Sequence, residues 1–220
     1  MDVYKTEEET IESVKQWWKE NGLAVVLGLI IGLGGIYGVR SWIGYQQTQS
    51  EQASAIYDQL ANALAAKKYI EVLKQGDAIL NDYDGTPYAA LASMAMAKAK
   101  LDSGDAAGAR GNLQWVIDNA DDEIQHIAQV RLLRLMLDAK EYDAVLSVLA
   151  KQKKSAFSST YDELRGDVYA AQGKSVQARE AYRLALSALP NGSQRRPLMQ
   201  MKLDDLAEHT ATVAPASSTN

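Results

Sequence analysis

The most prominent hydrophobic pattern in the chain is an apolar run near its N-terminus. It covers residues 23–39, reads LAVVLGLIIGLGGIYGV and contains no charged residue. Residues 22–43 give about 22 positions, or roughly 33 Å of helix, which is enough to cross a bilayer. Aromatic side chains flank the run, as is typical of membrane interfaces: Trp17, Trp18, Tyr37, Trp42 and Tyr45. The pattern predicts a single transmembrane helix over residues 22–43.

Two other interpretations of this run fit less well. As a buried soluble helix it would carry five glycines in 17 residues, each costing about 1 kcal/mol relative to alanine in water. That cost is smaller in a membrane, where an unfolded backbone finds no hydrogen-bond partners. As a cleaved signal peptide it would need a cleavage site close by, whereas the small residues Ala53-Ser54-Ala55 begin 14 positions beyond Val39. An uncleaved signal-anchor therefore fits better.

Small residues recur along one side of the predicted span. Ala24, Gly28 and Gly32 are four positions apart, and Gly34 and Gly38 form a second such pair. Ridges of this kind let another helix approach closely. A homodimer through Ala24, Gly28 and Gly32 and docking onto a larger membrane complex are both consistent with the ridge, although glycine is common in membrane helices in any case.

Basic residues near the span predict its orientation. Lys5, Lys15 and Lys19 precede it, whereas Arg40 is followed by no basic residue until Lys67. Because basic flanks stay in the cytoplasm, residues 1–21 are expected to be a cytoplasmic segment. The remainder is then outside the cytoplasm, which in a bacterium means the periplasm. The expected arrangement is a single-pass, type II inner-membrane protein in contact with lipid.

After residue 45 the pattern changes to successive amphipathic helices with short polar breaks. Gly104, Ala139 and Gly173 occupy turn-like positions 35 and 34 residues apart. An alanine follows each of them by five positions: Ala109, Ala144 and Ala178. A period of 34 residues is the length of the tetratricopeptide helix–turn–helix unit.

The last unit carries the pattern most completely. Its small, aromatic and proline positions match the tetratricopeptide repeat, with Asp162 in place of the tryptophan: Gly166, Tyr169, Gly173, Ala178, Tyr182, Ala185 and Pro190. A degenerate hairpin is expected over 50–82, with Tyr69 and Leu73 on its second helix, and a capping helix over 195–208. The predicted fold is all-α, with one transmembrane helix and a tetratricopeptide-like α-solenoid over 44–208. Residues 209–220 are expected to form a disordered tail.

Composition restricts the chemistry. The chain has no cysteine and a net charge of −5, which leaves no thiol chemistry and gives no reason to expect nucleic acid. His126 and His209 are the only histidines; His126 is expected to be a packing or surface residue. The cluster Asp121–Glu123 is expected to cap a helix, and the basic group at 151, 153 and 154 to favour a helix C-terminus. No catalytic, cofactor-binding or metal-binding residue is predicted, and no small-molecule substrate.

Five segments together resemble the YfgM family of ancillary SecYEG translocon subunits. They are VYKTEEETIESVKQWWKENG, the span ending in GVRSW, YAALASMAMAK, LRGDVYAAQGKSVQAREAY and MQMKLDDL. The resemblance implies a non-catalytic adaptor in the inner membrane that associates with SecYEG and the periplasmic chaperone PpiD and helps to hand over secreted proteins. The alternative is a tetratricopeptide scaffold for another cell-envelope assembly, or for a stress-response regulator, which the family is also linked to stabilising.

Overall fold

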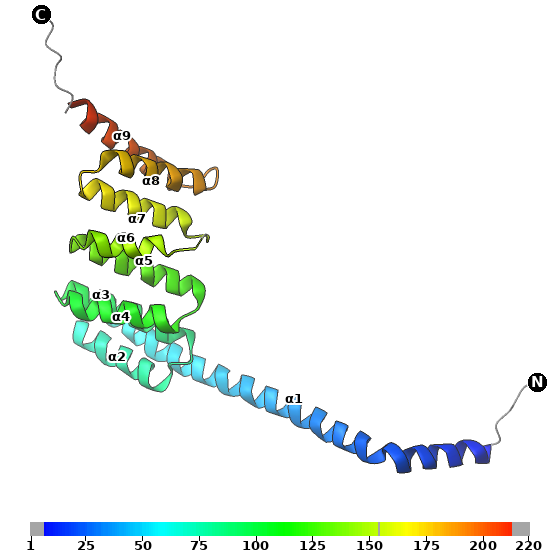
Figure 1. The fold of residues 1–220 in the computed structure, drawn as a ribbon. Coiled ribbons are helices and arrows are strands. Elements are labelled where there is room, and N and C mark those ends of the chain that lie inside the picture. The colour runs from blue at the N-terminus through cyan, green and yellow to red at the C-terminus, as the bar shows by residue number, and fades with distance from the viewer. Residues whose placement is uncertain (1–6, 154, 213–220) are drawn as a thin grey trace, which may run out of the picture. The chain divides into compact units, whose positions relative to one another are not determined.

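A computed structural model describes residues 7–153 and 155–212. These residues form nine helices and no strand (Figure 1). The helices are α1 (Glu7–Ala65), α2 (Tyr69–Asp82), α3 (Pro87–Asp102), α4 (Ala106–Asn119), α5 (Asp122–Asp138), α6 (Tyr142–Ala150), α7 (Ser158–Ala171), α8 (Ser175–Ala188) and α9 (Arg196–Thr212). The all-α prediction is confirmed. The chain divides into two compact units, residues 1–54 and 55–220.

The first unit consists of most of α1. α1 runs from Glu7 to Ala65 without interruption, so the predicted span of residues 22–43 is the middle part of one longer helix. Residues 7–65 contain no proline and no turn signal, and isolated glycines do not end a helix. By length and composition, α1 is the one helix in the described part of the chain that could cross a membrane. Its apolar side chains are exposed, as Leu29, Ile31 and Tyr37 illustrate.

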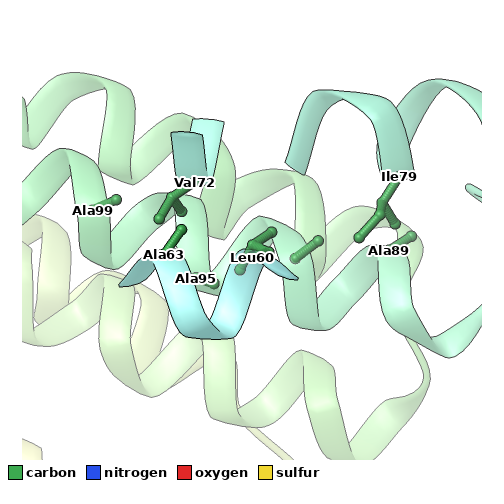
Figure 2. Packing of buried hydrophobic residues seen from close by; sticks show 8 residues of the cluster. Leu60, Ala63, Val72, Ile79, Ala89, Ala95 and Ala99 are labelled. Atoms are coloured by element: carbon green, nitrogen blue, oxygen red, sulfur yellow. The ribbon is translucent and has the colours of Figure 1, made fainter. Parts of the chain in front are cut away.

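The second unit is a stack of helical hairpins followed by one more helix (Figure 1). The end of α1 pairs with α2, and then α3 with α4, α5 with α6 and α7 with α8, while α9 packs on α8. With its partly buried members, each hydrophobic cluster draws side chains from at least three successive helices. In the first of them, Leu60 of α1 meets Val72 and Ile79 of α2 and the alanines of α3 (Figure 2). No hairpin buries its apolar faces alone, which is the physical basis of a solenoid.

All four hairpins turn in the same way. A residue with positive φ ends the first helix of each, and the next residue donates its N–H to a carbonyl five positions earlier, as in the Schellman motif. The donor–acceptor pairs, at 2.8–2.9 Å, are Lys68 to Ala63, Asp105 to Lys100, Glu141 to Met136 and Lys174 to Tyr169. The positive-φ residues are Lys67, Gly104, Lys140 and Gly173. The repeat therefore extends to the hairpin of α1 and α2, as predicted.

The predicted register of the third hairpin is wrong by one residue. Its left-handed position is Lys140, not Ala139, so the turns after Gly104 follow at 36 and 33 residues. The position five residues after the turn is therefore Val145, which is fully buried, while Ala144 is exposed. Ala139 and Ala144 have the spacing of the small residues of the repeat, but Val145 occupies the buried position of the second helix.

The last hairpin and the cap form as predicted. Ala178, Tyr182 and Ala185 are buried, and Gly166 lies against the ring of Tyr182. Met199 of α9 is fully buried in the same cluster. α9 continues to Thr212 and so includes the first residues of the segment expected to be a tail. Residues 213–220 of that segment lie outside the described residues.

Candidate partner-binding face

Two grooves lie between the first helices of successive hairpins. One, of about 320 Å³, is lined from α3, α4 and α5, and the other, of about 370 Å³, from α5, α7 and the start of α9. We call them the α3–α5 groove and the α5–α9 groove. Each includes an apolar side chain that is more than two-fifths exposed, Leu101 in the first and Leu198 in the second. This face therefore offers open apolar sites on both sides of α5.

Two arginines of α5 belong to both grooves. Arg131 and Arg134 line each of them and are exposed. Arg131 lies 3.5 Å from Met94 Sδ, and no carboxylate of the described residues forms a salt bridge with either arginine. The pair was missed as a site at the sequence level. Two arginines three positions apart within a leucine-rich helix were the available signal, but a single sequence does not show which face they occupy.

An ionic network lies on the side of the α5–α9 groove formed by α7 and the start of α9. Glu163 of α7 is buried and accepts from Lys202 Nζ at 2.8 Å and from Arg195. Lys202 also binds Asp167 Oδ1 at 2.7 Å, which in turn accepts from Tyr182 Oη at 2.7 Å. Arg195 donates a further hydrogen bond to Thr160 at 2.9 Å. The network holds α9 and the loop before it onto α7.

Burial and charge act in opposite directions on the ionisable groups of this network. Burial alone would raise the pKa of Glu163, but the hydrogen bonds and charges of Lys202 and Arg195 outweigh it and keep the pKa below its ordinary value. Burial alone would lower the pKa of Lys202, but Asp167 and Glu163 hold it above its ordinary value. Burial and the hydrogen bond to Asp167 raise the pKa of Tyr182. Glu163, Lys202 and Tyr182 therefore keep their usual charge at neutral pH.

The sequence candidates for chemistry occupy structural positions. His126 is half-buried, lies against the Phe157 ring and has its Nδ1 2.6 Å from Tyr161 Oη, as expected of a packing residue. Asp121 precedes α5 as its N-cap but makes no capping hydrogen bond through its side chain, while Asp122 and Glu123 lie in the first turn. The described residues contain no group of three or more acids or histidines that could hold a metal ion.

Other candidate residues lie apart from the two grooves. Lys151 follows the C-terminus of α6 and Lys153 is exposed, whereas residue 154 lies outside the described residues. The side chain of His209 is also outside them. On α1, Gly28 and Gly32 are exposed, and a Cβ added to either would meet nothing within 4 Å. The small-residue ridge is thus open along its side of the helix.

Comparison with known proteins covers both units of the chain. A family model described as "Tetratricopeptide repeat-like domain" matches residues 15–208. A protein of Haemophilus influenzae named "Ancillary SecYEG translocon subunit" is 33% identical over 91% of this chain and 97% of its own length. The chain belongs to the YfgM family of ancillary SecYEG translocon subunits.

Proteins with the same name in Neisseria gonorrhoeae and Escherichia coli are 31% and 28% identical. Each match covers 94% of this chain and the full length of that relative. No solved structure matches the chain. The family model covers the apolar part of α1 as well as the helical repeats.

Proposed function

We propose that this chain is a membrane-anchored, non-catalytic adaptor that associates with the SecYEG translocon. The observation that carries the proposal is the near full-length similarity to relatives named as ancillary subunits of that translocon. The exposed apolar side chains of α1 suit a helix surrounded by lipid. The helical repeats supply an extended surface for protein partners, as solenoids do.

The proposal includes a topology. Residues 1–21 lie in the cytoplasm, 22–43 span the inner membrane, and the part of the chain from residue 44 onward lies in the periplasm. The chain has no cysteine, so single-cysteine variants report position without background. With a membrane-impermeant maleimide in spheroplasts, Ala156→Cys should react and Glu12→Cys should react only after lysis. The reverse labelling would overturn the topology.

In the membrane, the ridge of Ala24, Gly28 and Gly32 is the contact surface of the span, for a translocon helix or for a second copy. Photo-crosslinkers at Ala24 and Gly28 should capture a translocon subunit or form a homodimer in intact cells. Matched crosslinkers at Val26 and Ile30 face away, because two positions turn a helix by about 200°. They should capture mainly lipid. Equal capture from both pairs would rule out a specific ridge contact.

In the periplasm, the repeat domain binds the chaperone PpiD and brings it to proteins leaving the translocon. The support is the similarity to the YfgM family together with the open grooves of the repeat domain. Purification of the tagged full chain from mild detergent should recover SecYEG subunits and PpiD. Recovery of a different envelope assembly without SecYEG would replace the proposal with a general scaffold function.

A further inference from the structure

The two grooves beside α5 combine apolar lining with unpaired positive charge. The side chains that line them include four cationic groups, Lys98, Arg131, Arg134 and Arg195, and two anionic ones, Asp138 and Glu163. This gives the face a net charge of +2 on a chain whose net charge is −5. Lys98 is paired with Asp102, and Arg195 with Glu163. The lining charges that remain are all on α5, namely Arg131, Arg134 and Asp138, and their net charge is +1.

We propose that this face binds an extended peptide segment in which one acidic side chain stands between two apolar side chains. The carboxylate would lie against Arg131 and Arg134, and the apolar side chains would enter the two grooves. Leu101 and Leu198 are the exposed apolar side chains that those two would contact, one in each groove. Arginine is suited to the carboxylate because its planar group donates two parallel hydrogen bonds.

The position of the arginines indicates which kind of carboxylate fits. Grooves lie on both sides of α5, so a peptide that fills both continues in both directions past the arginines. The carboxylate is therefore an internal Asp or Glu side chain and not the end of a chain. Neighbouring helices lie about 8–10 Å apart, and successive side chains of an extended chain point to opposite faces. The three side chains that face the protein are therefore two positions apart, and the two apolar ones are separated by about 13 Å of chain, which is enough to reach both grooves. The expected motif is apolar–any–acidic–any–apolar.

This inference rests on the proposed adaptor function and supplies the chemistry of the segments that the adaptor recognises. The test uses the full chain in nanodiscs and short fluorescein-labelled, C-terminally amidated peptides with the core Leu-Ser-Glu-Ser-Leu. Binding is followed by fluorescence anisotropy. Peptides with Gln or Lys in place of Glu, and one with both Leu replaced by Ser, should bind at least about tenfold more weakly. Higher salt should weaken binding of the Glu peptide.

Variants of the protein separate the charge from the grooves. The double variant R131Q/R134Q should lose at least about tenfold in affinity for the Glu peptide. The control K74Q/R183Q removes the same charge at exposed positions outside both grooves and should bind normally. R131E/R134E should instead prefer the Lys peptide, which shows that loss of binding is not loss of folding. L101S and L198S should each weaken binding of the Glu peptide.

Three results would overturn the inference. They are equal binding of the Glu and Gln peptides, normal binding by R131Q/R134Q, and no binding of any peptide at about 1 mM, the weakest affinity worth considering. Dependence on a free C-terminal carboxylate would overturn the internal site specifically. Copurification of SecYEG is measured in parallel. If SecYEG copurifies while the peptides fail, only this inference falls; if the peptides bind while SecYEG is absent, only the proposed function falls.

Discussion

The close approach of α7 and α8 at Gly166 provides a sharp stability test of the repeat domain. A Cβ on Gly166 would lie 2.3 Å from Cε1 and 2.4 Å from Cδ1 of Tyr182. The ring has little room to move, because it is buried and its hydroxyl is bonded to Asp167. Gly166→Ala should therefore push α7 and α8 apart.

The expected loss of unfolding free energy in Gly166→Ala follows from two opposing effects. Overpacking of this kind costs about 1–3 kcal/mol, and so short a contact favours the upper half of that range. Alanine instead of glycine in a helix returns about 1 kcal/mol. The net loss should be about 1–2 kcal/mol. Gly111→Ala is the matched control, because Gly111 is also inside a helix but a Cβ there would meet nothing within 4 Å. That variant should gain up to about 1 kcal/mol.

Urea unfolding of the full chain in detergent, followed by far-UV circular dichroism, measures both variants. With a slope of about 1–3 kcal/mol/M, Gly166→Ala should lower the midpoint by roughly 0.5–1 M, and Gly111→Ala should raise it. Because solenoid repeats can unfold separately, hydrogen exchange should assign the loss to α7 and α8. Equal stabilisation by both variants would mean that Gly166 and Tyr182 are not in close contact.

Three further predictions concern individual contacts. Glu163→Gln leaves Lys202 and Arg195 without their buried counter-ion, so it should destabilise the docking of α9 by about 1–3 kcal/mol, seen as faster amide exchange in α9 only. In the parent protein the low pKa of Glu163 contributes stability that is complete above the ordinary glutamate range and is lost as the pH falls through the lowered value. An acid titration of thermal stability should therefore be flatter in Glu163→Gln, and an unchanged profile would contradict the pairing. Val145→Ala should cost about 2 kcal/mol in urea unfolding, whereas Ala144→Val should change stability little; the opposite order would restore the register predicted from the sequence. Lys140→Gly should stabilise the third hairpin by up to about 1 kcal/mol, because glycine adopts the left-handed backbone conformation of residue 140 without steric cost. An unchanged or lower melting temperature would contradict this.

The repeat could be predicted from sequence where its turns carry glycine. Gly104 and Gly173 have positive φ, and no other residue adopts that conformation as readily, so both turns were found in register. At Lys67 and Lys140 a lysine takes the same conformation, and the turn signal disappears from the sequence. The spacing of the alanines then placed the third turn at Ala139, one residue too early, because alanine is common on every face of these helices.

Long-range contacts lay beyond sequence reasoning for a different reason. Glu163 and Lys202 are 39 positions apart, and nothing local in either segment indicates that they meet. Their pairing depends on the position of α9 against α7 and α8, and that position is determined by the packing of Met199 and Tyr182. The amphipathic pattern of 195–208 was enough to predict a capping helix but not the ions beneath it. The arginines of α5 were visible as residues but not as a pair between two grooves.

The placement of charge on this face separates structural ions from those available to a partner. Glu163 is buried and satisfied by two cations, and removing both would leave a costly buried charge. Arg131 and Arg134 are exposed and form no salt bridge with any described residue, so a carboxylate brought by a partner would meet them without breaking an existing pair. An exposed charge pair alone contributes little affinity. Binding on this face therefore requires apolar contacts in the grooves as well, and neither the arginines nor the grooves should suffice alone.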